Sequence, residues 1–193
     1  MSYVLCIVNA NRAFIRPSGR VPTRSGNHQK ESDMTGKDTT AGRILTYFGY
    51  GTLLGESHMR KSYPSAKTIG VGLYDQHDLG FWRYADASDG GCTIVHNPDG
   101  ILFGVLYELS PQDMDRLLLV GGLAEWYEVR TVDITRVSGG RTRAITLRVQ
   151  GNRGPWVPPE DYAGYVTNGA REAGLPKEYC TRLDAIVEKA RRG

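Results

Sequence analysis

The sequence predicts a single domain of the α/β or α+β class. Three observations lead to this prediction. The chain has 193 residues, which is the usual length of one domain. Runs of β-prone residues follow one another closely through its middle. Helical patterns lie between those runs and at the C-terminal end, an arrangement typical of these two classes.

In the first half, a buried strand is expected over residues 44–49, followed by a turn that Gly51 and Gly55 bracket. A short helix is expected over residues 56–63. It should end before Pro64, because proline disfavours helical backbone at the residue that precedes it. Strand segments follow at 67–75, 77–84, 92–96 and 101–109. The last two segments are joined by Asn-Pro-Asp-Gly at 97–100, which is a strong turn signal.

In the second half, Ser110 and Pro111 begin a helix as N-cap and first helical residue, and Gly121-Gly122 end it. Strands over 126–137 and 141–149 alternate around the hairpin turn Ser-Gly-Gly. Two helices, over 160–173 and 177–192, complete the chain and are separated by Gly-Leu-Pro.

Charge is distributed unevenly along the chain. The net charge is +3, yet residues 1–43 alone carry seven Lys and Arg against three acids, so the remaining 150 residues sum to −1. A nucleic-acid surface on the folded part is therefore not expected. No run approaches the roughly 18 apolar residues of a membrane helix. Cys6, Cys92 and Cys180 are widely spaced without a Cys-x-x-Cys pair, which indicates reduced thiols in the cytoplasm.

Residues 1–43 are expected to be a disordered or non-native leader, and residues 44–193 the folded domain. The leader is rich in Asn, Arg, Ser, Gly, Pro and Thr, and it offers little apolar surface to offset the entropy of ordering. Met34 as the true start is one interpretation. An organellar transit peptide is another, since four arginines precede the first acid, Glu31.

The turn Tyr50-Gly51-Thr52-Leu53-Leu54 follows the first predicted strand and precedes a predicted helix. A glycine there lets successive backbone N–H groups point at one spot, and such a nest binds carboxylate or phosphate without a charged side chain. The same pattern is equally that of a plain connection between a strand and a helix.

This turn resembles the Tyr-Gly-Ser-Asn-Leu signature of the γ-glutamylcyclotransferase family, with Thr52 for Ser and Leu53 for Asn. The likeness continues through Pro64-Ser65-Ala66, through Gly90-Gly91-Cys92-Thr93-Ile94 followed by Gly104-Val105-Leu106-Tyr107, and through residues 168–179. It covers roughly residues 44–186.

The resemblance implies a small mixed-strand β-barrel flanked by helices. It implies an enzyme that releases 5-oxoproline and an amine from a γ-glutamyl amide, with neither metal nor cofactor, as a monomer or homodimer. The substrate is a small molecule with a carboxylate, held by the backbone at residues 50–54. Tyr127 matches a family position that faces the pocket. A different reaction on such a molecule, or its binding without turnover, is the alternative.

This chemistry needs a carboxylate that first accepts and then returns a proton. The family uses a Glu followed by Gly, and the matching pair here is Gly121-Gly122. Glu125, four residues on, is the candidate replacement; the alternative is that it is a solvated loop acid. Glu128 is expected to face away from Tyr127, because neighbouring strand residues point to opposite faces.

Other candidates favour structural roles. His58, His77 and His96 belong to no metal-ligand motif, and Cys92 fits a small buried apolar position. Trp82, Tyr84 and Trp156 fit either a pocket wall or the core.

Overall fold

The computed structural model describes residues 45–85, 88–122, 126–151 and 153–192. The predicted leader, residues 1–43, lies outside the described residues, and so does Glu125. The strands are β1 (Leu45–Gly49), β2 (Lys67–Arg83), β3 (Gly90–Leu109), β4 (Tyr127–Arg136) and β5 (Arg141–Val149). The helices are α2 (Glu56–Ser62), α3 (Pro111–Gly122), α4 (Glu160–Glu172) and α5 (Lys177–Arg192).

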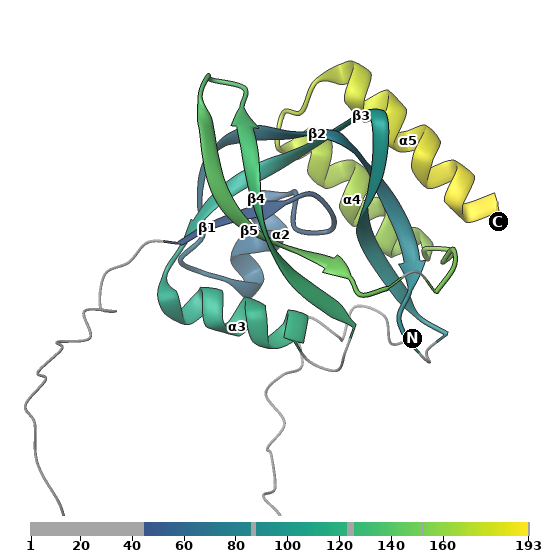
Figure 1. The fold of residues 1–193 in the computed structure, drawn as a ribbon, viewed down its shortest axis with the longest axis horizontal. Helices are drawn as coiled ribbons and strands as arrows, with labels where there is room; N and C mark the ends of the chain where they lie inside the picture. Colours follow the sequence, from purple (N-terminus) through teal and green to yellow (C-terminus); the bar gives the residue numbers. More distant parts are fainter. Residues whose placement is uncertain (1–44, 86–87, 123–125, 152, 193) are drawn as a thin grey trace, which may run out of the picture.

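The strands close into a barrel in the order β1-β3-β2-β4-β5. All neighbours are antiparallel except β1 and β5, which run parallel where Tyr47 pairs with Ile145. Helices α4 and α5 pack on each other along one side, and α3 lies apart from them against β4 (Figure 1). The expected mixed-strand barrel flanked by helices is confirmed.

The expected turn at residues 97–100 is wrong as a hairpin connection. Strand β3 passes straight through it, and both of its halves pair with β2, whose two expected segments are likewise one strand. Asp75 pairs with Ile101 and His77 with His96, so only Gln76 stands opposite residues 97–100. Gln76 adopts φ 60°, as expected for the residue that absorbs a bulge of this size. The true hairpin joins Arg83 to Gly90.

Helix α3 begins as its sequence predicts. The Asp113 amide donates to the Ser110 hydroxyl over 3.2 Å, which is the expected N-cap bond. Met114 and Leu117 are fully buried, so the predicted apolar face packs into the core. The helix ends at Gly122, and Gly121 therefore lies in its last turn.

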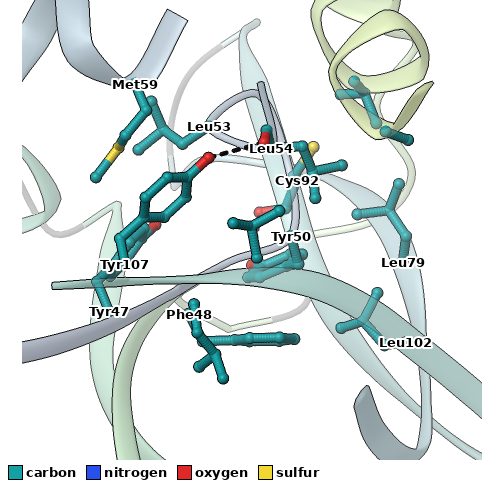
Figure 2. Close-up of a cluster of buried hydrophobic side chains, with 14 of the residues drawn as sticks. Tyr47, Phe48, Tyr50, Leu53, Leu54, Met59, Leu79, Cys92, Leu102 and Tyr107 are labelled. Carbon is teal, nitrogen blue, oxygen red and sulfur yellow. Dashed lines mark hydrogen bonds between the residues drawn. The ribbon is translucent and has the colours of Figure 1, made fainter. Parts of the chain in front are cut away.

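The core lies on both sides of β1, because alternate residues of a strand point to opposite faces. Phe48 and Tyr50 stack inside the barrel with ring centroids 6.3 Å apart. Tyr47 lies on the other face beside Tyr107 and Met59, under helix α2 (Figure 2). Among the helices in the described part of the chain, none has both the length and the apolar character needed to cross a membrane.

Candidate functional site

The turn at residues 50–54 lies directly against β3. A Cβ atom added to Gly51 would lie 2.9 Å from Cys92 Cβ and 3.0 Å from Cys92 Sγ. Glycine is thus needed here for the close approach of the turn to the Cys92 side chain. The turn is closed by the Leu54 amide, which donates to the Gly51 carbonyl over 3.1 Å.

Two amides of this turn have partners inside the protein. Besides that of Leu54, the backbone of Thr52 hydrogen-bonds the Cys92 thiol. Leu53 and Leu54 are buried, and the Leu54 carbonyl accepts the Tyr107 hydroxyl over 2.8 Å (Figure 2). The side chains of Leu53 and Leu54 therefore belong to the core.

The N-terminal end of α2 already holds an anion of this chain. Glu172, at the end of α4, accepts the Ser57 amide over 2.8 Å and the Ser57 hydroxyl over 2.9 Å. A Cβ atom on Gly55 would lie 2.7 Å from the Glu172 carboxylate. The negative charge that is stabilised at a helix N-terminus is thus supplied by Glu172 of the same chain. Sequence reasoning missed Glu172, because 115 residues separate it from Ser57.

Tyr50 joins two strands that are not neighbours in the barrel. Its hydroxyl donates to the Leu147 carbonyl of β5 over 2.6 Å and lies 3.3 Å from the Cys92 carbonyl of β3. Burial raises the pKa of Tyr50 well above its usual value, so the phenol stays neutral. These bonds hold the start of the turn against the barrel interior.

Three further tyrosines bring their hydroxyls to Gly91 and Cys92, and we call Tyr84, Tyr127 and Tyr162 the phenol cluster. The hydroxyls of Tyr84 and Tyr127 lie 2.7 Å apart in a hydrogen bond. A Cβ atom on Gly91 would collide with the Tyr127 hydroxyl and lie 2.6 Å from that of Tyr84. The Tyr162 hydroxyl accepts the Cys92 amide over 2.9 Å. Position 91 is therefore a glycine because the hydroxyls of Tyr84 and Tyr127 occupy the space that a Cβ atom would need.

The phenol cluster is electrically neutral. Burial raises the pKa of Tyr127 and of Tyr162 well above the ordinary value. Burial also raises the pKa of the Cys92 thiol to about 12, so the sulfur is protonated at neutral pH. These groups can donate and accept hydrogen bonds, but none of them is a nucleophile or base at physiological pH.

Glu128 faces away from the phenol cluster, as the alternation of β4 predicts. It pairs across the strands with Arg148 and forms ion pairs with Arg148 and Arg130. Desolvation acts to raise the pKa of Glu128, but the hydrogen bonds and charges of the two arginines outweigh it and lower the pKa. A carboxylate held in this way is a poor general base.

The remaining sequence candidates lie in other surroundings. Trp156 packs on Phe81 and Tyr162, so it serves the core, whereas Tyr84 belongs to the phenol cluster. Within the described ranges, no three His, Cys, Asp or Glu side chains gather where they could hold a metal ion. Tyr162 was missed by sequence reasoning, because nothing in its helical pattern distinguishes it from a core aromatic.

Comparison with known proteins shows which proteins resemble this chain in sequence and architecture. The AIG2-like family model matches residues 101–183. Gamma-glutamylcyclotransferase of Mus musculus is 27% identical over 169 residues, which span 84% of this chain and 89% of the mouse protein. An uncharacterized protein from Homo sapiens has a similar solved structure, with a TM-score of 0.70 and 25% identity over 74% of this chain and 88% of that one.

A second solved structure, named gamma-glutamyl cyclotransferase, has a TM-score of 0.68 and 22% identity, and covers 78% of this chain and 100% of that chain. At this identity the likeness concerns the fold. Sequence and fold matches agree on the same group of proteins, and the turn at residues 50–54 resembles its signature. The chain is therefore similar in sequence and in fold to γ-glutamylcyclotransferase-like proteins.

Proposed function

We propose that this protein binds a γ-glutamyl amide beside the phenol cluster and cyclises it to 5-oxoproline and a free amine. The approach of three phenol hydroxyls to two neighbouring residues of β3, Gly91 and Cys92, of which Cys92 lies against the turn at residues 50–54, is the observation that supports this most. Neutral hydroxyls suit an amide carbonyl, because they hydrogen-bond it without bringing a charge that must be desolvated.

In the proposed reaction the α-ammonium of the substrate first loses a proton to a base. The amine nitrogen then attacks the γ-carbonyl carbon and forms the ring C–N bond, and the bond to the leaving nitrogen breaks. The ring nitrogen gives up a second proton, and the leaving nitrogen takes one. A single carboxylate can carry out these transfers as base and then acid. The amide of Leu53 and the backbone of Gly51 are the proposed contacts for the substrate carboxylate.

We infer that Glu125 is the base. It lies outside the described residues, so this assignment rests on its place in the sequence directly before Trp126. Trp126 stacks on Tyr84 with ring centroids 4.8 Å apart. Glu128 is occupied by two arginines, and glycine at position 121 has no side chain that could move a proton.

The test is to incubate the purified full chain with γ-glutamyl dipeptides and γ-glutamyl amines and to measure 5-oxoproline by mass spectrometry. Glu125→Gln should reduce the rate by at least about a hundredfold. Glu178→Gln, which alters an exposed carboxylate of α5, should leave it unchanged. An unaltered rate in Glu125→Gln would remove this base but keep the reaction, whereas no product across the panel would remove the reaction.

Glycine at position 121 favours a second candidate function, which is binding of the same carboxylate-bearing molecule without turnover. The expected signature is a ligand-dependent rise in melting temperature with no 5-oxoproline formed. Gly121→Glu would restore a carboxylate in the last turn of α3. If that variant alone forms 5-oxoproline, the natural protein is a binding protein.

We also infer that residues 44–193 contain the whole functional domain and act in the cytoplasm as a monomer or homodimer without a cofactor. The barrel elements all lie after residue 44, and the proposed chemistry needs only proton transfer. A chain that starts at Met34 should match the full chain in activity and melting temperature. A loss of either in the shorter chain would assign a role to the first residues.

A further inference from the structure

Thr93 of β3 has a polar atom without an assigned role. Its side chain is 0% exposed, and its hydroxyl has no hydrogen-bond partner within the described ranges. Thr146 of β5 is equally buried, yet its hydroxyl donates to the Phe48 carbonyl over 2.8 Å. Folded proteins rarely leave a buried hydroxyl unpaired, because it loses its bonds to water and gains none. The Thr93 hydroxyl therefore indicates a missing partner.

Strand geometry places Thr93 on the side of Tyr84 and Tyr127, two members of the phenol cluster. Residues two apart in a strand share a face, so Thr93 and Gly91 point the same way. The Cα–Cβ direction of Gly91 leads to the hydroxyls of Tyr84 and Tyr127. Thr93 is displaced from that point by two strand residues, which is roughly 7 Å. A small molecule bound at the phenol cluster can span this length.

The opposite strand, β2, brings a glycine and an indole to this face. Gly80 of β2 pairs with Thr93, and Trp82 pairs with Gly91. A Cβ atom on Gly80 would lie 2.5 Å from Val95 Cγ2, 3.4 Å from Thr93 Cγ2 and 3.8 Å from the Trp82 indole nitrogen, so Val95 fills the space directly beside Gly80. Among the described residues, this face carries the Thr93 hydroxyl, the Trp82 indole N–H and the paired phenols of Tyr84 and Tyr127.

We propose that the Thr93 hydroxyl donates a hydrogen bond to a neutral carbonyl oxygen of the molecule bound at the phenol cluster, and so determines ligand specificity. The inference rests on the proposed function for the identity of that molecule, an acyl compound of the γ-glutamyl or 5-oxoproline type. The Thr93 hydroxyl, the Trp82 indole and the phenols of Tyr84 and Tyr127 are uncharged at neutral pH. A carboxylate placed here would lose its hydration with no cation to replace it, whereas a carbonyl needs only one donor.

The experiment compares Thr93→Val, Thr93→Ser and the matched control Thr146→Val in the full chain. Calorimetry measures the Kd for 5-oxoproline and for a γ-glutamyl dipeptide, and a thermal scan measures the melting temperature. Thr93→Val should raise both Kd values by roughly three- to tenfold, with a melting temperature equal to or above that of the natural protein. Thr93→Ser keeps the donor and should hold Kd within about twofold, even though a lost methyl group lowers the melting temperature.

Thr146→Val should show the opposite pattern, a lower melting temperature with an unchanged Kd, since it leaves the Phe48 carbonyl without its donor. Unchanged Kd values in Thr93→Val would overturn the inference and assign the hydroxyl to an internal water molecule. Equal weakening in Thr93→Val and Thr93→Ser would also overturn it, because packing would then explain the effect. If the natural protein binds neither compound, the proposed function fails and this inference fails with it.

Discussion

The two regions that flank the turn at residues 50–54 are built from opposite chemistry. At the N-terminal end of α2, a charged carboxylate from Glu172 takes two hydrogen bonds from Ser57. At Gly91, uncharged phenols gather, and a buried threonine hydroxyl has no partner within the described ranges. The first region is complete in itself and stabilises the contact between α2 and α4. The second contains a buried hydroxyl, that of Thr93, whose hydrogen bond is not satisfied by the described residues.

This contrast identifies which part of the turn is available. The helix end that looks suited to an anion from the sequence is used by the chain's own carboxylate. In the proposed function, recognition of the small molecule is therefore assigned to the backbone near Gly51 and to the hydroxyls around Gly91. Substitutions that disturb one of the two regions and spare the other test this division of roles between structure and binding.

The largest expected effect is the protection of Cys92 from alkylation. Its pKa is raised from 9.0 to about 12, which lowers the thiolate population about a thousandfold. Iodoacetamide at mildly alkaline pH should label Cys92 at least about a hundredfold more slowly in the native protein than in guanidinium chloride. Cys180 is only partly buried and serves as the internal control, followed by peptide mass spectrometry. Rapid native labelling of Cys92 would contradict its burial and mean that the region between Cys92 and Gly51 is open to solvent.

The next effect is that of Gly91→Ala. The added methyl group meets the hydroxyls of Tyr84 and Tyr127, so the pair must move apart. We expect a loss of about 2 kcal/mol in the free energy of unfolding and at least about tenfold weaker binding of 5-oxoproline. Gly164→Ala is the control, because its nearest neighbour would be Asn168 at 3.7 Å. That helix substitution should stabilise by about 0.5 kcal/mol. Normal binding in Gly91→Ala would contradict a ligand site at the phenol cluster.

Glu172→Gln addresses the other region. The amide side chain keeps one acceptor but loses the charge, so the bonds to Ser57 weaken. Because these groups are exposed, we expect a loss of only about 1 kcal/mol in the free energy of unfolding, measured by urea titration. Ligand affinity should stay the same. A drop in affinity without a drop in stability would show that Glu172 serves the ligand and not the fold.

The smallest effect concerns His58, which packs on Tyr165 beside the α2–α4 contact. Burial lowers the pKa of His58, Lys61 lowers it further, and Glu172 opposes both. A histidine whose pKa is lower in the folded state stabilises the protein above its unfolded pKa of about 6.5, and this contribution is lost as the pH falls through the folded pKa. Urea titrations between roughly pH 7 and pH 5 should therefore show a steeper loss in the natural protein than in His58→Gln. Parallel pH profiles would exclude His58 as a source of acid sensitivity.

Local pattern was sufficient for most of the fold. The helices over residues 160–173 and 177–192 were predicted within a residue of their observed bounds, because Pro and Gly punctuate them and their apolar faces are regular. The bulge at 97–100 could not be foreseen, since Asn-Pro-Asp-Gly favours a turn in either arrangement. The chain continues as one strand because β3 pairs with β2 both before and after residues 97–100. This pairing is a tertiary contact that the local sequence does not reveal.

The sequence by itself determined the class of fold, the order of its elements, the N-cap at Ser110 and the position of the turn at residues 50–54. These depend on interactions between residues close in the chain, so periodicity and capping reveal them. Tertiary structure alone decided that Glu172 occupies the end of α2, that Tyr162 joins Tyr84 and Tyr127, and that the Thr93 hydroxyl is buried without a partner in the described part of the chain. The physical reason is that each of these is fixed by a contact between distant segments, which no local pattern encodes.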